Sequence, residues 1–317
     1  NSTHTFQACA LNRSAISPKI NITLINSYTI LIKFMKNCKM YCLSISNEDL
    51  SIIQSLDYIP VGLGNDNFSN QWVTDKILNN ISQKNKFYGE YTFHYWFWKN
   101  VLPKIENNDW VGFCAYRDYW AKEKVNILDK DKIQNQEIQR NSKKIKDLVL
   151  NDIPKEWDGY DSIIGEYLHL DHPLKISKIL KHGIKSFIRN PNAIFKKGRT
   201  IRFQFDMFHG NGNLDKAIDI LDKKERDDFR EFTRSNTYFN RGNMFVCRSK
   251  KTMNDYYESI FAWLLECEKI FGFDLSGYGQ LRIYAFLAER YLSYWFTKYT
   301  NPLLWPVIHF DTIHNTN

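Results

Sequence analysis

The chain has 317 residues, 43% hydrophobic and 15% aromatic, enough to fill the core of one large α/β domain or two small ones. This composition excludes long disordered stretches, and the lack of any run of about 18 apolar residues excludes a membrane-spanning helix. The formal net charge of +8 is compatible with phosphate-bearing ligands, an anionic membrane surface or nucleic acid, and does not choose among them.

The cysteines indicate a reducing compartment. There are six of them, with no C-x-x-C pair and no spacing typical of zinc ligation. Cys114 and Cys247 lie in apolar, strand-like runs, where a reduced thiol behaves as a small hydrophobic side chain. The amino-terminal residues also lack the basic-then-apolar pattern of a signal peptide. We therefore expect a cytoplasmic protein.

Residues 1–37 are interpreted as a non-catalytic leader that precedes a single domain at 38–312. The domain opens with a predicted strand at 40–46, a short helix near 50–56 that is preceded by acidic residues, and a strand at 58–64 that ends in glycines. This β-α-β order predicts a doubly wound or related nucleotide-binding sheet.

Residues 75–99 read mostly as one helix that is rich in aromatic residues and carries Glu90. Trp96 in this helix is suited either to stacking on an acceptor sugar or to core packing. The next strand, 110–114, is apolar and stops at Arg117 and Asp118. A buried strand that ends in charge is how an open α/β sheet presents chemical groups at its carboxyl edge.

The middle of the chain adds another strand and a basic helix. A strand at 160–167 ends near Glu166, again at the edge where ligands bind. Residues 175–202 alternate apolar and basic positions at helical spacing, which fits either contact with an anionic membrane through 175–189 or an ordinary surface helix. Residues 203–212 are interpreted as a loop that carries Asp206 and His209.

The carboxyl-terminal part is predicted to be mainly helical, with helices at 214–234, 253–271 and 280–299 and a polar turn that leads into a strand at 237–247. Together with the strands above, this predicts an α/β fold with a mixed, mainly parallel sheet.

Known nucleotide and hydrolase motifs are absent: there is no G-x-x-x-x-G-K-[ST], G-x-G-x-x-G, H-E-x-x-H or G-x-S-x-G. The strand at 110–114 is also not followed by Asp-x-Asp. One carboxylate beside a guanidinium is a poor site for a divalent cation, so no metal ligand is assigned, and Mn²⁺ or Mg²⁺ is an open alternative. Arg117 is suited to neutralising a diphosphate directly, or to a structural ion pair with Asp118.

Several segments between residues 40 and 310 carry a family resemblance. They are N-N-I-S at 79–82, Lys84-Asn85 and Gly89-Glu90 followed by Y-W-F-W-K-N at 95–100, G-F-C-A-Y-R-D-Y at 112–119, N-M-F-V at 243–246, and G-Y-G-Q-L-R-I-Y-A-F-L-A-E-R at 277–290. With them the chain resembles a bacterial family of capsular and exopolysaccharide glycosyltransferases, the domain-of-unknown-function 4422 family, in particular capsule-locus transferases of epsilon-proteobacterial type. Members of this family resemble GT-A glycosyltransferases.

The resemblance implies transfer of a sugar from a nucleotide diphosphate donor, most simply a UDP-sugar, to a hydroxyl of a glycan or lipid-linked glycan on the cytoplasmic side of the inner membrane. It implies donor-binding roles for Asp75, Asn80, Lys84, Asn85 and Arg117, and an acceptor-side role for His209 and Trp96. The candidates for the catalytic carboxylate are Glu90, Asp118, Glu166, Asp206 and Glu289, of which Glu289 is also suited to a structural ion pair with Arg290 or Arg282. Ala115 and Asp118 stand where the family often has histidine or another polar residue and a second arginine, which leaves Arg117 as the cation.

Two other classes compete with this reading. One is a non-catalytic glycan-binding or scaffold protein of the capsule machinery. The other is a nucleic-acid-binding protein that uses the basic helix and the aromatic residues. Neither needs Arg117 together with the block at 84–90, and we therefore expect no nucleic-acid partner.

Overall fold

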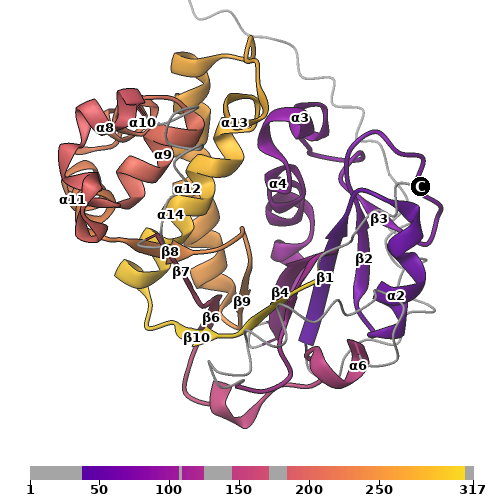
Figure 1. The fold of residues 1–317 in the computed structure, drawn as a ribbon. Coiled ribbons are helices and arrows are strands. Elements are labelled where there is room, and N and C mark those ends of the chain that lie inside the picture. The colour runs from indigo at the N-terminus through magenta and orange to yellow at the C-terminus, as the bar shows by residue number, and fades with distance from the viewer. Residues whose placement is uncertain (1–37, 107–108, 125–144, 171–183, 311–317) are drawn as a thin grey trace, which may run out of the picture. The chain divides into compact units, whose positions relative to one another are not determined.

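In a computed structural model the described residues are 38–106, 109–124, 145–170 and 184–310, and they all belong to the unit Lys33–Asn317. The expected leader and most of the basic segment at 175–189 therefore lie outside the described residues. The unit contains a nine-stranded sheet whose central path runs β10-β6-β9-β4-β1-β2-β3 (Figure 1). These strands are β1 Cys38–Ser44, β2 Ile59–Gly62, β3 Val73–Thr74, β4 Trp110–Ala115, β6 Ser162–Gly165, β9 Phe245–Cys247 and β10 Leu303–Trp305.

The sheet is mixed and mainly parallel. β1 pairs in parallel with β2 and β4, β2 with β3, and β6 with β10, while β9 runs antiparallel between β4 and β6. Two further strands, β5 Asp118–Trp120 and β11 Val307–His309, pair antiparallel beside β4. β7 Tyr167–His169 and β8 Tyr238–Asn240 form a separate two-stranded ladder. The predicted sheet type is confirmed.

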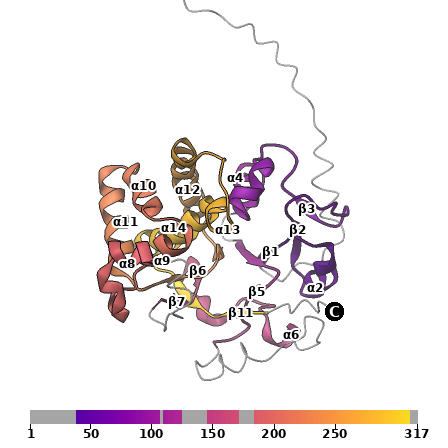
Figure 2. The ribbon, with the colours of Figure 1, turned by 45° about the horizontal axis from the view of Figure 1, so that its top comes forward.

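Helices cover both faces of this sheet, and most of them follow β7. They are α2 Leu50–Ser55, α3 Asn85–Tyr88, α4 Tyr91–Asn100, α6 Ile145–Leu148, α8 Ile184–Arg189, α9 Ile201–His209, α10 Asn213–Asp219, α11 Lys223–Ser235, α12 Lys250–Phe271, α13 Tyr278–Leu281 and α14 Ile283–Tyr299. Figures 1 and 2 both show α8 to α11 grouped on the side of the unit away from α2.

Alternation along the strands separates two cores. In β1, Tyr41 and Leu43 pack against α4, α12 and α14 on one face, while Met40 and Cys42 point to the other face with α2 and a group of tryptophans. The five cysteines within the described residues, Cys38, Cys42, Cys114, Cys247 and Cys267, are buried and free. Burial raises the pKa of Cys247 to about 12, so this thiol is inert, as expected from its apolar strand.

Two helix predictions and one loop prediction were wrong. Residues 75–99 do not form one helix, because Gly89 adopts φ +55° and separates α3 from α4, and residues 75–81 are bends and irregular backbone. The segment 203–212 is not a loop. Thr200 caps α9 by accepting a hydrogen bond from the backbone N of Phe203, and Gly210 ends it, so Asp206 and His209 are helical. The helix at 214–234 is interrupted before Asp222, which caps α11.

Candidate active site

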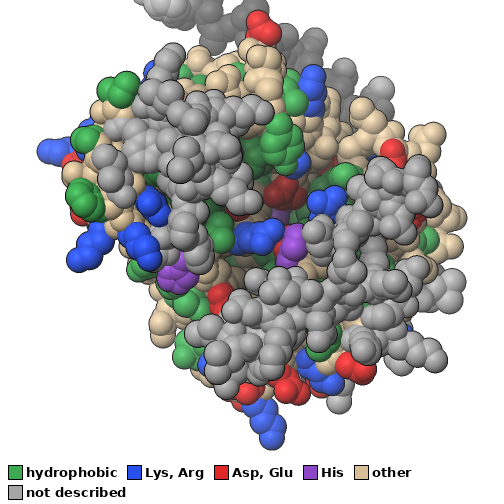
Figure 3. All heavy atoms as spheres, in the orientation of Figure 1, with side chains coloured by type: hydrophobic (Ala, Val, Ile, Leu, Met, Phe, Trp, Pro, Cys, Tyr) green, Lys and Arg blue, Asp and Glu red, His purple; other side chains and the backbone are tan. Residues whose placement is uncertain are grey.

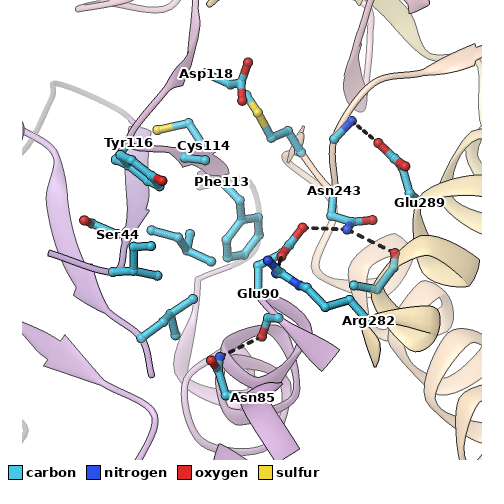
Figure 4. Close-up of a pocket in the computed structure, with 18 of the residues that line it drawn as sticks. Ser44, Asn85, Glu90, Phe113, Cys114, Tyr116, Asp118, Asn243, Arg282 and Glu289 are labelled. Carbon is cyan, nitrogen blue, oxygen red and sulfur yellow. Dashed lines mark hydrogen bonds and ion pairs between the residues drawn. The ribbon is translucent and has the colours of Figure 1, made fainter. Parts of the chain in front are cut away.

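A cavity of about 360 Å³ opens at the carboxyl ends of β1, β2 and β4, within the size range of small-molecule sites. Its walls come from the ends of these strands, the α3–α4 junction, the turn between β8 and β9, and the start of α14 (Figure 4). Figure 3 shows a hollow near the centre of this face, with acidic, basic and histidine side chains in it. The predicted placement of a site at the carboxyl edge fits this cavity.

Glu90 stands at the α3–α4 junction with both carboxylate oxygens engaged. Oε1 accepts a hydrogen bond from Asn243 Nδ2 at 2.7 Å, and Oε2 accepts one from Arg282 Nη2 at 3.1 Å. Asn243 is itself fixed by a second hydrogen bond from Nδ2 to the Ala285 carbonyl at 3.3 Å. Three segments far apart in the sequence therefore hold one carboxylate at the cavity wall, as Figure 4 shows.

Gly89 makes this arrangement sterically feasible. A Cβ on Gly89 would lie 2.1 Å from Arg282 Nη2, a distance that excludes the guanidinium from its present position. Its positive φ is also a conformation that other residues adopt only under strain. Two features therefore favour glycine next to Glu90: the positive φ of the backbone and the close approach of the Arg282 guanidinium.

Glu289, on α14, lines the same cavity beside the turn between β8 and β9. Its Oε1 accepts a hydrogen bond from the backbone N of Gly242 at 2.7 Å, and Oε2 is paired with the fully buried guanidinium of Arg290. Burial raises the pKa of Glu289, and the pairing with Arg290 offsets this only in part. The expected ion pair with Arg290 is present, and the carboxylate reaches the cavity as well.

Asp118 lines the cavity beyond the end of β4, where His309 Nδ1 lies 2.8 Å from Asp118 Oδ1. The neighbouring Tyr116 also lines the cavity, whereas Arg117 does not appear among the lining residues. The Arg117 guanidinium lies over the Tyr116 ring at 5.0 Å, and its Nε is buried without a hydrogen-bond partner among the described residues. Arg117 is thus adjacent to the cavity rather than in its wall.

The other residues predicted to bind the donor behave differently from one another. Asn85 lines the cavity and donates hydrogen bonds to the Gly89 carbonyl and the Thr92 hydroxyl. Lys84 is turned toward Glu268, with Nζ 2.6 Å from Oε1. Asn80 closes a local turn by accepting hydrogen bonds from Ser82. Asp75 follows β3, is 1% exposed, and its Oδ2 has no partner among the described residues. Of these four, only Asn85 reaches the cavity wall.

The remaining predicted residues lie outside the lining of this cavity. Asp206 is buried on α9 and accepts a hydrogen bond from the backbone N of Gly212 at 2.8 Å. Trp96 is buried and donates to the Ile77 carbonyl at 2.8 Å. Glu166 follows β6, and its backbone N donates to the Trp305 carbonyl. His209 stacks on Phe286 with ring centroids 3.9 Å apart, and Phe286 is a wall residue.

No group of three or more histidine, cysteine, aspartate or glutamate side chains suited to a metal ion occurs within the described ranges. Among the charged side chains that line the cavity, Glu90, Asp118 and Glu289 are acidic and Lys86 and Arg282 are basic. The two cations are the groups in this wall that can attract a phosphate.

A family model matches residues 39–301 of the chain, and its description is "Domain of unknown function (DUF4422)". The chain belongs to the DUF4422 family. The match includes every wall segment of the cavity, from the end of β1 to the start of α14. The family predicted from the motifs at 79–100, 112–119 and 277–290 is therefore confirmed at this level.

The fold of this DUF4422 chain is similar to that of a solved structure, the bifunctional glycosyltransferase WbbM in its apo form. The TM-score is 0.58 at 18% sequence identity, and the match covers 86% of this chain and 45% of the WbbM chain. This confirms an α/β fold that resembles a glycosyltransferase, while the chain spans less than half of the relative. No curated protein matches the sequence.

Sequence reasoning missed Asn243, Arg282 and His309 as site residues. Asn243 and Arg282 were inside segments that carried the family resemblance, and this was the available signal. His309 had no signal, because its relation to Asp118 arises only from the pairing of β11 with β5.

Proposed function

We propose that this DUF4422 protein is a glycosyltransferase that transfers a sugar from a nucleotide diphosphate sugar, most simply a UDP-sugar, to a hydroxyl of a capsular or other surface polysaccharide acceptor. One observation carries the proposal. A cavity at the carboxyl ends of three parallel strands holds an ordered carboxylate, Glu90, beside the cation Arg282. The family membership and the glycosyltransferase-like fold support the same reading.

The strand ends suit the nucleoside part of the donor. Leu43, Leu63 and Phe113 supply apolar surface, and Ser44 and Asn85 supply polar groups near it. We therefore propose that Asn85 binds the donor, as the sequence suggested. For Asp75, we propose an indirect role, because the Thr92 hydroxyl that interacts with Asp75 also accepts a hydrogen bond from Asn85.

The diphosphate needs cations, since negative charge develops on the leaving phosphate as the glycosidic bond breaks. Arg282 and Lys86 are the cations in the cavity wall. We propose Arg282 for the role that the sequence suggested for Lys84 and Arg117, because Arg282 lines the cavity and those two residues do not. Arg117 would then support the wall through Tyr116. The mechanism uses no Asp-x-Asp metal site.

The acceptor hydroxyl needs a carboxylate that takes its proton. We propose Glu289, because burial raises the pKa of its carboxyl group and a raised pKa makes a carboxylate a better general base near neutral pH. Glu90, which accepts hydrogen bonds from Asn243 and Arg282, would orient the sugar. Asp118 with His309 would border the cavity on the strand side.

The first test is a thermal-shift and calorimetric screen of the full chain against UDP, GDP, CMP and their sugars, each with Mn²⁺ and with EDTA. A nucleotide sugar at a hundredfold excess over its Kd stabilises a protein by about 2.7 kcal/mol, which is readily measured as a rise in Tm. We expect one nucleotide class to stabilise the protein in EDTA. If no nucleotide does so under either condition, the protein is not a nucleotide-sugar transferase, and stabilisation only with Mn²⁺ would overturn the metal-free mechanism.

The second test separates the role of the carboxylate Glu289 from that of the cation Arg282. Glu289→Gln should retain donor binding and lower the rate of transfer about 10²–10⁴-fold, the contribution of a general base. Arg282→Gln should weaken donor binding itself. Equal loss of donor binding in both variants would show that Glu289 does not act as the base.

A further inference from the structure

A second groove, of about 780 Å³, lies outside the candidate active site and is markedly basic. It is lined by Arg189 at the end of α8, Lys197 in the short helical turn Lys196–Gly198, Arg202 on α9 and Arg234 on α11. Figures 1 and 2 both show these helices grouped together. The groove has no part in the function proposed above.

Three of the arginines converge on one carboxylate. Asp215 lies 3.1 Å from Arg189 Nη2, 2.7 Å from Arg202 Nη2 and 3.3 Å from Arg234 Nη2. The hydrogen bond and charge of Arg202 outweigh burial and lower the pKa of Asp215, so the carboxyl group stays ionised. The other nearby acid, Asp206, is buried, and its Oδ2 lies 3.8 Å from Arg189 Nε.

Positive charge therefore exceeds negative charge here. The groove carries four cations against these two carboxylates, and each guanidinium has five N–H donors, more than the carboxylates engage. Lys196 beside the groove is exposed and adds to the excess. Phosphate is one of the anions whose geometry the paired donors of a guanidinium match.

Large apolar side chains stand exposed at the same place. Ile188 is 75% exposed and Phe195 is 71% exposed, the two highest values among the large hydrophobic residues of the described chain. Phe195 is itself part of the groove, directly before Lys196 and Lys197. A soluble anion does not require such exposed apolar side chains, whereas an interfacial surface combines basic residues with Phe and Ile for insertion between lipids.

We propose that this surface docks on an anionic lipid bilayer. Lipid phosphates would occupy the groove, and Phe195 and Ile188 would enter the boundary between headgroups and acyl chains. The charge complementarity and the exposed apolar pair both favour this occupant. Within the described part of the chain, no helix has the length and apolar character to cross a bilayer. The sequence suggested membrane contact through residues 175–189. Of these, the structure describes residues 184–189, which include Ile188 and Arg189.

The test is co-sedimentation of the full chain with vesicles of phosphatidylcholine alone or with one third phosphatidylglycerol, without any sugar donor. We expect binding only to the anionic vesicles. Lys196→Glu with Lys197→Glu should weaken it at least tenfold, since each basic residue near an anionic surface contributes about fivefold. Ile188→Ser with Phe195→Ser should weaken it to a similar extent.

Matched controls are available outside the groove, at the start of α11, whose other end carries Arg234, and on α12. Lys223→Glu with Lys224→Glu changes the same charge on α11, and Leu265→Ser with Ile270→Ser removes two exposed apolar side chains from α12. Both should bind vesicles like the unmodified chain. Equal loss in the controls, or no vesicle binding at all, overturns the proposal. A rise in Tm with inorganic phosphate that the Lys196/Lys197 variant loses, without vesicle binding, would assign the groove to a soluble phosphate compound instead.

Discussion

Asn243 Nδ2 donates a hydrogen bond to Glu90 Oε1 at 2.7 Å, although the two residues are 153 positions apart in the sequence. Asn243 lies in the turn that joins β8 to the antiparallel strand β9, and Glu90 begins α4. The hydrogen bond therefore links the strand side of the cavity to its helical side. It also fixes which oxygen of Glu90 is left to Arg282.

Asn243→Ala should lower kcat/KM for sugar transfer about 10- to 100-fold, because a hydrogen bond to a charged group contributes about 1.5–3 kcal/mol. Steady-state kinetics with the donor found in the screen provide the measurement. Asn236→Ala is the matched control, since Asn236 also donates one side-chain hydrogen bond, to the Phe232 carbonyl at the end of α11. An equal loss of activity in both variants would contradict a role for Asn243 in the site.

Gly89→Ala should abolish donor binding and lower stability by about 1–3 kcal/mol, the cost of a non-glycine residue in a strained backbone conformation. The loss of binding follows from the clash of the new Cβ with Arg282. Urea unfolding and calorimetric titration with the donor measure the two effects separately.

Gly272→Ala is the control for strain alone. Gly272 ends α12 with φ +59°, close to the +55° of Gly89, and a Cβ there meets nothing within 4 Å. It should lose similar stability and keep donor affinity. If both variants bind the donor normally, the contact between Gly89 and Arg282 has no importance for the site.

Asp75→Asn should stabilise the free protein at neutral pH by on the order of 1 kcal/mol. Burial raises the pKa of Asp75 above its ordinary 3.8, so the folded state holds the proton to higher pH than the unfolded state. The stability of the unmodified chain therefore falls as pH rises through the raised pKa. Asparagine does not titrate, so the advantage of the variant should vanish as pH falls toward 3.8.

Urea unfolding at several pH values measures this difference, with the exposed Asp219→Asn as control. The same variant should bind the donor more weakly if Asp75 supports Asn85 through Thr92. A variant that is less stable at neutral pH and unchanged in acid would refute the electrostatic account.

His209→Phe should reduce the sensitivity of the protein to acid. Burial, together with the charge of Arg290, lowers the pKa of His209 to about 3, whereas a histidine in the unfolded chain titrates near 6.5. Below about pH 6.5 the unfolded state gains a proton that the folded state does not, so stability falls as pH decreases toward 3. Each such histidine contributes a slope of about 1.4 kcal/mol per pH unit.

His94 is the second buried histidine of this kind, because burial lowers its pKa to about 3. In the His209→Phe variant, the slope of stability against pH should therefore keep the contribution of His94 and lose that of His209. Urea unfolding between about pH 4 and 6 can resolve this difference. An unchanged slope would mean that His209 is already protonated in the folded protein.

Much of the fold could be predicted because its signals are local. The apolar runs at 40–46, 58–64 and 110–114 overlap β1, β2 and β4, and the charged end of β4 pointed to the edge of the sheet at which the cavity opens. Two of the three errors, at 75–99 and 203–212, arose because the prediction gave more weight to the many aromatic residues than to single capping residues. These residues were Gly89 in the first segment and Thr200, just before the second. Both signals were present in the sequence.

The site was less predictable because its contacts are long-range. The sequence suggested Glu90, Asp118 and Glu289 as separate candidates, and nothing local relates Glu90 to Asn243 or Arg282, or Asp118 to His309. Lys84 carried the right charge for a phosphate, but its partner Glu268 is 184 residues away on α12. Which cation faces a cavity depends on how the helices pack against one another, and the hydrophobic periodicity of the sequence does not predict that packing.

The pairing of β11 with β5 has a consequence for synthesis on the ribosome. Asp118 is made early, but its partner His309 and the strand β10 that covers β6 follow α14. Until these strands emerge, β5 and β6 present open edges that can pair with other chains. A prematurely terminated product would thus combine an incomplete cavity with an adhesive sheet edge, so that inactivity and recognition by chaperones or proteases arise from the same missing strands.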